Sequence, residues 1–408
     1  MEKLKGNLLY GQSGGPTSVI NASAYGVIRE ALKNKDIIGE VYCMKHGIHG
    51  VLHDQVVKVS ELDPEQIELL VNTPGAAFGT VRYKMKQWEE NDSEYVKILE
   101  ILKKYDIRYF LYNGGNDSME TCFEIDEYLK HIGYPCRVIG IPKTIDNDLP
   151  VTDHCPGYGS AAKYIANACM EIACDSSAYP KGKVTIAEIM GRHTGWLTAA
   201  SYVATATKFG PDLIYLPEIP FSTEQFKEDI RRVMQKKDHC LVAVSEGIHD
   251  VFGNFIAASS GTKDAFGHTQ LGGVCHKLAS IVSDELGYST RPCELSLLQR
   301  SAAHLQSGSD VKEAINVGRH GVRYALAGKT SVMVCMRRLP GDKYRIQYFT
   351  HSLKDVAAVE KTVPREMINE DGNFIKPEFL AYVLPLIEGQ NKPKFKNGVM
   401  QFASILKP

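Results

Sequence analysis

The 408-residue sequence carries almost no net charge, and this absence limits the partners that it can bind by charge alone. Its 47 Lys and Arg residues face 48 Asp and Glu residues, which gives a formal net charge of −1. Proteins that bind nucleic acids usually present a strongly basic field. We therefore expect no nucleic-acid partner, and any cations that bind phosphate must be gathered locally.

Cysteine pairs and long hydrophobic runs are also missing. The ten cysteines form no C-x-x-C pair and show no Cys/His spacing typical of zinc sites, so free thiols in a reducing compartment are the simplest interpretation. No uninterrupted apolar run approaches the roughly 20 residues that span a bilayer. The first six residues, MEKLKG, lack the apolar core of a signal peptide. These observations predict a cytoplasmic protein without a membrane partner.

What the sequence does contain is an alternation of short apolar runs and helical patterns, which is typical of parallel α/β proteins. Its length allows one large or two moderate domains. Strands are predicted at 7–10, 41–44, 109–112, 137–141, 184–189, 212–215 and 240–244, with a hairpin between 331–337 and 344–350. Helices are predicted at 17–34, 64–71, 92–105, 118–129, 160–174, 196–206, 223–236, 272–286 and 377–386. We expect two similar α/β units with a cleft between their strand ends.

The most informative stretch is Gly140-Ile-Pro-Lys-Thr-Ile-Asp-Asn-Asp148, at the end of a predicted buried strand. Open α/β sheets bind ligands at the carboxyl ends of their strands. Lys143 could hold a phosphate there, while one of Asp146 and Asp148 accepts a hydroxyl proton and the other serves a metal. The stretch therefore suits phosphoryl transfer, although an ordinary Asp-Asn-Asp turn would also account for it.

Two glycine-rich turns strengthen the first interpretation. Residues 11–15 (GQSGG) and 113–118 (NGGNDS) each follow a short apolar strand and precede a helical pattern. Glycines let backbone N–H groups approach a phosphate, and a helix N-terminus favours anions. Neither turn matches the Walker or G-x-G-x-x-G pattern, so each alone could be a tight βα turn. Together with 140–148, they favour a phosphate-binding cleft.

In their order along the chain, these motifs resemble those of the phosphofructokinases. The resemblance runs from about residue 5 to about residue 330, and the remainder is similar to the extension of a longer bacterial subgroup. It rests on Gly14-Gly15, Gly114-Gly115-Asn-Asp-Ser118, Pro142-Lys-Thr-Ile-Asp-Asn-Asp148, Met190-Gly-Arg192, Glu246 and Gln299-Arg300. It implies an α/β fold of two Rossmann-like three-layer domains. Residues 1–158 with about 299–350 would bind the phosphoryl donor, and 159–298 with part of 351–408 the sugar phosphate.

The resemblance also implies a role for individual residues in transferring a phosphoryl group to the 1-hydroxyl of fructose 6-phosphate. Asp146 would be the catalytic base, Thr144 would bind the transferring group, and Asp148 would lie near Mg²⁺ and the hydroxyl. Glu246 would bind sugar hydroxyls. The remaining implied substrate-binding residues are Gly15 in the first turn, Arg82 at the donor, the loop Met190, Gly191 and Arg192, Arg291 and Arg300 at the 6-phosphate, and Lys183, which would reach a neighbouring subunit's phosphate.

Departures from the ATP-using members concern the phosphoryl donor. Those members carry Asp-Gly where this chain has Asn116-Asp117, and glycine where it has Lys143. Asp117 would oppose the α-phosphate of ATP by bulk and like charge, whereas Lys143 would neutralise a compact pyrophosphate. Asn116 would keep an oxygen near the metal. A further departure is Leu297, where the family has a histidine that contacts the sugar phosphate.

The sequence therefore predicts a reversible transfer between pyrophosphate and fructose 6-phosphate, with Mg²⁺ as cofactor. It also predicts a homo-oligomer, dimer or tetramer, with a site shared between subunits. An ATP-dependent 6-phosphofructokinase is the nearest alternative. A non-catalytic regulatory subunit is another, and the intact motif set argues against it. A lipid or NAD kinase would leave the string Thr-Ile-Asp-Asn-Asp unexplained.

Overall fold

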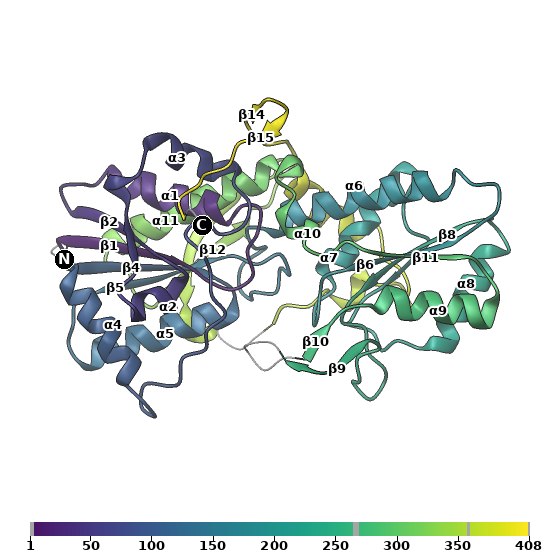
Figure 1. Cartoon of the computed structure of the whole chain (residues 1–408), viewed down its shortest axis with the longest axis horizontal. Helices are drawn as coiled ribbons and strands as arrows, with labels where there is room; N and C mark the ends of the chain where they lie inside the picture. The colour runs from purple at the N-terminus through teal and green to yellow at the C-terminus, as the bar shows by residue number, and fades with distance from the viewer. Residues whose placement is uncertain (1–3, 264–268, 357–359, 407–408) are drawn as a thin grey trace.

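Two mostly parallel sheets lie side by side along the long axis of the protein (Figure 1). The computed structural model describes residues 4–263, 269–356 and 360–406. Within these ranges the larger sheet has seven strands in the order β13-β12-β5-β4-β1-β2-β3, and the smaller has four in the order β11-β6-β8-β7. The predicted α/β class with two sheets is confirmed, and the two sheets differ in size.

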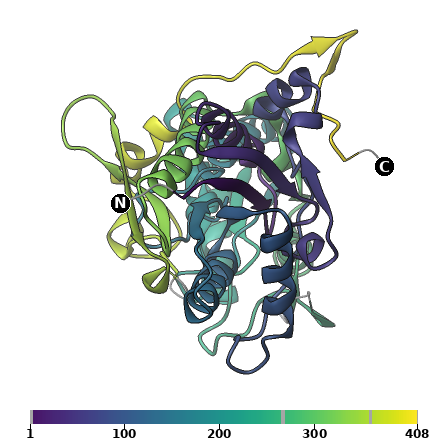
Figure 2. The same ribbon diagram turned by 90° about the vertical axis from the view of Figure 1, so that its left-hand side faces the viewer.

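The larger sheet is covered by helices on both faces, as the end-on view of Figure 2 shows. Successive side chains of a strand point to opposite faces. Tyr109 and Leu111 accordingly pack beneath α1 (Ile20–Leu32) and α11 (Gly308–Leu326), and Phe110 and Tyr112 pack beneath α4 (Ser93–Lys104) and α5 (Asn116–His131). Its strands are β1 (Gly6–Gln12), β2 (Ile38–Met44), β3 (Val56–Lys58), β4 (Ile107–Gly114), β5 (Arg137–Pro142), β12 (Val332–Arg338) and β13 (Ile346–Ser352). Its helices are α1 (Ile20–Leu32), α2 (Gly47–Leu52), α3 (Pro64–Leu69), α4 (Ser93–Lys104), α5 (Asn116–His131) and α11 (Gly308–Leu326).

The smaller sheet is parallel throughout and is also enclosed between helices (Figure 1). Its strands are β6 (Val184–Ile189), β7 (Leu213–Tyr215), β8 (Cys240–Ser245) and β11 (Thr290–Glu294). Helices α6 (Tyr158–Ser176) and α7 (Trp196–Ala200) cover one face, and α8 (Thr223–Met234) and α9 (Val274–Leu286) the other. Short elements complete the chain: α10 (Leu298–Ser301), α12 (Glu378–Val383) and the hairpins β9 (Ala258–Lys263) with β10 (Thr269–Leu271) and β14 (Phe395–Lys396) with β15 (Val399–Met400).

Residues 360–387 of the C-terminal segment after β13 pack against the smaller sheet's helices, whereas Ala403 and Ile405 pack against the core of the larger sheet. Val363, Phe379 and Leu386 share one hydrophobic core with residues of α6 and α7. The division of the chain into two domains, with its boundaries, stays a prediction. In the described ranges, no helix combines the length and the apolar character needed to cross a membrane.

Candidate functional site

Sheet topology brings the sequence-predicted loops together. In the larger sheet β1 and β4 are neighbours, but the chain continues from β1 to β2 on one side and from β4 to β5 on the other. Ligands bind outside the strand ends at such a switch point. The register places Gln12 beside Asn113 and Gly114 beside Pro142. The loops 13–15, 115–118 and 143–148 therefore lie at one edge of the sheet.

The smaller sheet directs a second pair of motifs toward this edge. Ile189 of β6 pairs with Ser245 of β8, so the loop that begins at Met190 lies beside Glu246. Contact between the two edges is direct, because Thr194 Oγ1 donates a hydrogen bond to the carbonyl oxygen of Asp146 at 3.0 Å. Residues of the two sheet edges therefore meet at one site, here called the cleft.

Arginine side chains reach the cleft from two further segments. An atom at the Cβ position of Gly15 would lie 3.1 Å from Arg300 Nη1 and 3.9 Å from Arg82 Nη2. A larger residue in place of Gly15 would therefore press on Arg300. The glycine in the first turn leaves room for two guanidinium groups, which suit phosphate recognition.

Lys143 is a buried cation in this cleft, with 3% of its surface exposed. Its Nζ donates a hydrogen bond of 2.7 Å to the carbonyl oxygen of Gly15. Burial lowers the pKa of Lys143 to about 8, although Asp146 and Asp148 oppose the shift. Because its remaining N–H donors lie among the cleft loops, Lys143 is placed to bind an anionic group there.

The carboxylate of Asp146 has the properties expected of a base. Burial, followed by the nearby charges of Asp148 and Glu246, raises the pKa of Asp146 to about 7. The loop is held locally, since the backbone N–H of Asp146 donates to Thr144 Oγ1 at 3.0 Å. Bases work best when their pKa lies near the working pH. Asp146 is thus suited to accept a proton near neutrality.

Asn116 and Asp148 form a pair of oxygen donors that fits a hard cation. Asn116 Nδ2 donates to Asp148 Oδ2 at 3.1 Å. The other oxygens, Asn116 Oδ1 and Asp148 Oδ1, are both buried and have no hydrogen-bond partner among the described residues. Buried oxygens normally have a partner, and carboxylate and amide oxygens are the ligands of Mg²⁺ and Ca²⁺. The two residues therefore fit a divalent cation.

The loop after β6 requires its glycine. Gly191 has φ of +146°, and a Cβ atom there would lie only 2.5 Å from the carbonyl oxygen of Thr194. Its backbone N–H donates to Glu246 Oε1 at 3.3 Å, and Met190 N donates to Gln299 Oε1 at 2.9 Å. Only glycine adopts this backbone without strain in so little space, so the loop is fixed against β8 and α10.

Glu246 and Arg300 link the two sides of the cleft electrostatically. Burial raises the pKa of Glu246, and the guanidinium groups of Arg192 and Arg300 counter that shift. Burial and nearby Arg82 lower the pKa of Arg300, opposed by Asp146 and Glu246. The charge of Arg300 therefore interacts with a carboxylate from each of the two sheets.

Asp117 lies in the first turn of α5, next to Asn116, and its side chain is exposed. The N-terminus of a helix is normally a favourable place for an anion. An aspartate already present there adds a negative charge that a bound polyphosphate would have to face. The position of Asp117 is thus compatible with the predicted role in donor choice.

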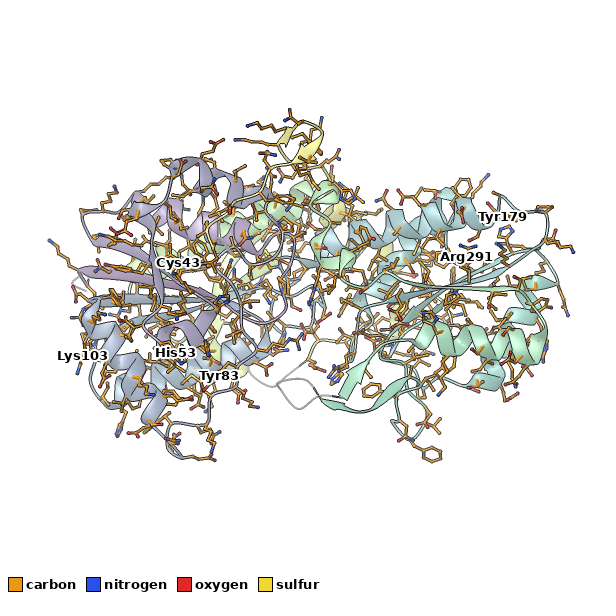
Figure 3. All side chains as sticks on the ribbon, viewed as in Figure 1. Cys43, His53, Tyr83, Lys103, Tyr179 and Arg291 are labelled. Carbon is orange, nitrogen blue, oxygen red and sulfur yellow. The ribbon has the colours of Figure 1, made fainter. Side chains whose placement is uncertain are left out.

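Two sequence-predicted cations lie elsewhere. Lys183 immediately precedes β6, whose opposite end leads to the loop at Met190, and a six-residue strand extends about 20 Å. Arg291 pairs with Thr185 at the same far end. Figure 3 shows Arg291 and Tyr179 well away from the larger sheet, and Lys183 Nζ lies 4.1 Å from the Tyr179 ring centre. Within one chain, Lys183 and Arg291 do not join the cleft.

The structure also shows contacts that sequence reasoning missed. The backbone N–H of Lys361 donates to the carbonyl oxygen of Asp148 at 2.7 Å, and Asn147 Nδ2 donates to the hydroxyl of Tyr382 at 2.7 Å. In each pair the two residues are more than 200 positions apart in the sequence. No local pattern around Lys361 or Tyr382 indicates the contact.

Comparison with known proteins agrees with this geometry. The phosphofructokinase family model matches residues 7–313. Pyrophosphate–fructose 6-phosphate 1-phosphotransferase of Halomonas elongata is 42% identical over 98% of this chain and 96% of its own length. The enzyme of the same name from Xanthomonas campestris is 44% identical over the same shares. The solved pyrophosphate-dependent phosphofructokinase of Nitrosospira multiformis has a TM-score of 0.89 at 38% identity, covering 98% of this chain and 96% of that one.

The match extends beyond the motifs, because it includes the arrangement of both sheets and nearly the whole length of each relative. The family model alone covers about three quarters of the chain. On these grounds the chain belongs to the phosphofructokinase family.

Proposed function

We propose that this protein transfers a phosphoryl group reversibly between pyrophosphate and the 1-hydroxyl of fructose 6-phosphate, in the cytoplasm and with Mg²⁺. The observation that carries the proposal is the buried Lys143, which bonds Gly15 and lies among the carboxylates of the cleft. A lysine there supplies positive charge to a compact donor. The names of the relatives from Halomonas and Xanthomonas support the same reaction.

The residues at the larger sheet's edge carry out the phosphoryl transfer, and each has a different role. Asp146, with its pKa near 7, accepts the proton of the sugar 1-hydroxyl as that oxygen attacks. Thr144 binds the transferring group, and Lys143 neutralises the charge that develops on the leaving phosphate. Asn116 and Asp148 would hold Mg²⁺ through the oxygens that have no hydrogen-bond partner among the described residues. When bound, Mg²⁺ neutralises phosphate oxygens and aligns the donor.

The facing edge binds the sugar phosphate. Glu246 accepts hydrogen bonds from sugar hydroxyls, and the loop at Met190, Gly191 and Arg192 contacts the sugar and its phosphate. Arg300 binds the 6-phosphate with its planar fork. Arg82, which also lies near Gly15, contacts the donor.

A neighbouring copy of the chain completes the sugar-phosphate site in this proposal. Lys183 and Arg291 lie together at the far end of the smaller sheet, beyond reach of their own cleft. In a homodimer or homotetramer they would contact the 6-phosphate bound by the adjacent subunit. Mixing an inactive Asp146→Ala subunit with an inactive Lys183→Ala subunit should restore activity, because some mixed oligomers regain one intact site. Verified mixed oligomers without activity would contradict the shared site.

Steady-state kinetics with both donors tests the reaction. The wild type should use pyrophosphate with Mg²⁺ and use ATP poorly, because Asp117 opposes the α-phosphate. Asp117→Gly should raise ATP use relative to pyrophosphate use, and Lys143→Gly should weaken pyrophosphate use. A wild type that prefers ATP would instead be an ATP-dependent 6-phosphofructokinase. A folded wild type that turns over neither donor would be a regulatory subunit.

A further inference from the structure

The loop that carries the proposed base contains an unusual residue between its two aspartates. Asn147 is fully buried and has φ of +56°, a left-handed conformation that non-glycine residues seldom adopt and that asparagine tolerates best. This conformation sets the directions in which Asp146 and Asp148 leave the backbone. Whatever holds Asn147 therefore also orients the two carboxylates.

The side chain of Asn147 is held from both ends of its amide. Its Oδ1 accepts a hydrogen bond from the backbone N–H of Cys155 at 3.0 Å, and its Nδ2 donates to the hydroxyl of Tyr382 at 2.7 Å. That hydroxyl in turn donates to the carbonyl oxygen of Asp153 at 2.9 Å. In this series of three hydrogen bonds, each donor and each acceptor is fixed by its chemistry. The amide of Asn147 therefore has a single favourable orientation.

Tyr382 is itself fixed by packing. Its ring centre lies 5.0 Å from that of Trp196 and 6.4 Å from that of Tyr158. Arg338 Nη2 donates to its carbonyl oxygen at 2.9 Å. Burial raises the pKa of Tyr382 well above its ordinary value, so the hydroxyl keeps the proton that it donates.

The same C-terminal segment contacts the loop a second time. The backbone N–H of Lys361 donates to the carbonyl oxygen of Asp148 at 2.7 Å. Its ammonium group donates to the carbonyl oxygens of Asp153 and Thr152 at 2.8 and 3.2 Å, and its own carbonyl accepts from Trp196 Nε1 at 2.8 Å. Two separate points of one segment therefore hold the loop 146–148 and the residues just after it.

We propose that the C-terminal segment is a positioning element for catalysis, in which Tyr382 and Lys361 hold the loop 146–148 so that Asp146 and Asp148 face the substrates. The proposal rests on the proposed function of that loop. A displacement of about 1 Å in a reacting group can lower the rate on the order of a hundredfold. Tyr382 contributes to turnover through Asn147 and touches no substrate itself.

Two matched substitutions separate positioning from simple stabilisation. Tyr382→Phe removes the hydroxyl that meets Asn147. Tyr158→Phe removes a buried hydroxyl from the same aromatic cluster, whose hydrogen bond among the described residues goes to the carbonyl oxygen of Trp196 at 3.2 Å and not to the loop 146–148. We expect Tyr382→Phe to lower kcat roughly tenfold or more with little change in either KM, whereas Tyr158→Phe keeps near-normal kcat. Equal kcat for the two variants at similar Tm would overturn the proposal.

A double-mutant cycle tests whether Tyr382 acts through Asn147. Asn147→Gly removes the amide but suits the positive φ. In that background Tyr382→Phe should have no further effect on kcat, because the hydrogen bond is already absent. Effects of Tyr382→Phe that are equally large with and without Asn147 would contradict the assignment.

Amide hydrogen exchange gives a measurement that does not depend on the reaction. Tyr382→Phe should speed exchange at Cys155, whose N–H bonds Asn147, more than Tyr158→Phe does. If the wild type proved inactive with both donors, this comparison would still decide whether the segment holds the loop. Equal exchange in both variants would overturn the proposal even in an active enzyme.

Discussion

The two sheet edges that face each other across the cleft differ in how they present their charges. At the larger sheet's edge, burial brings the pKa of a lysine down to about 8 and that of a carboxyl up to about 7. At the smaller sheet's edge, Gly191 offers a fixed backbone to Glu246, Arg192 is half-buried, and the burial-raised pKa of Glu246 is opposed by the backbone N–H of Gly191 and by Arg192 and Arg300. The first arrangement favours proton transfer and charge neutralisation, and the second favours binding.

The difference arises from what covers each edge. The loop 143–148 is enclosed by the first turn at Gly15, by Thr194 from the facing sheet, and by the C-terminal segment at Lys361. Enclosure removes water, and in a site of low polarity each charge acts more strongly on its neighbours. We therefore expect substitutions at the larger edge to lower kcat and substitutions at the facing edge to raise KM.

The largest effect should follow from removing the base. Asp146→Ala should lower kcat by roughly 10²–10⁴-fold, the range for a positioned general base. The KM for fructose 6-phosphate should change little, because the loss falls on the transition state. Steady-state kinetics in both directions would measure it. Near-normal turnover in a folded Asp146→Ala protein would show that the larger sheet's edge does not supply the catalytic base, and the proposed difference between the two edges would be wrong.

A smaller effect of a different kind should follow at Arg300. Arg300→Ala should raise the KM for fructose 6-phosphate by about 10–100-fold, because a charge-assisted hydrogen bond to phosphate contributes on the order of 1.5–3 kcal/mol. The KM for pyrophosphate should change much less. Arg300→Lys serves as the control, since it keeps the charge without the planar fork. Equal rises for both substrates would show that Arg300 serves the whole cleft.

Most elements and most of the cleft could be predicted from the sequence, because their signals are local. The strand at 184–189 is found with its predicted bounds, and the predicted hairpin is present as β12 and β13. The loops 11–15, 113–118 and 143–148 could be assigned to one edge, because parallel strands place their carboxyl ends together. The helix patterns at 196–206 and 377–386 continue as 3₁₀ turns after α7 and α12.

Elements whose local signal is interrupted by glycine, proline or charged residues were missed. Helix α11 has glycine at Gly318, where a Cβ atom would lie 2.2 Å from the carbonyl oxygen of Ser23 in α1. Its buried face carries an apolar stripe of Val311, Ala314, Val317, Val322 and Ala325, but Asp310, Glu313 and the glycines interrupt it. Strand β11 lies at the edge of its sheet and contains Pro292, which an edge strand tolerates. The contacts of Lys361 and Tyr382 depend on the tertiary fold alone.

The pH dependence should report both shifted groups of the larger edge. Asp146 must be ionised to accept a proton, so kcat/KM for phosphorylation should rise with pH through about 7. Lys143 must be protonated to neutralise phosphate, so kcat/KM should fall above about 8. The expected profile is a narrow bell. Lys143→Arg should move the alkaline limb to higher pH, and a profile unchanged by this substitution would exclude Lys143 as its origin.

The smallest effect is on stability, and it should have the opposite sign to the effect on activity. Folding raises the pKa of Asp146 to about 7 because its carboxylate is buried. Ionisation of Asp146 in the folded protein therefore lowers the free energy of unfolding. This destabilisation is absent below the unfolded pKa of about 4 and fully present above about 7. Asp146→Asn should therefore stabilise the protein at pH 8, on the order of 1–3 kcal/mol, and much less at pH 5.

Asp153→Asn is the control of opposite sign for this last comparison. Burial would raise the pKa of Asp153, but its hydrogen bond with His154 and the charges of His154 and Arg338 lower it overall. Its carboxylate therefore stabilises the fold at neutral pH, and this contribution is lost as pH falls through its folded pKa. Thermal unfolding from pH 5 to pH 8 measures the change in Tm that each of the two variants causes. Asp153→Asn should lower Tm at pH 8. If Asp146→Asn lowered Tm as well, the ionised carboxylate of Asp146 would stabilise the fold. The larger edge would then not hold the destabilising buried charge that distinguishes it from the smaller edge.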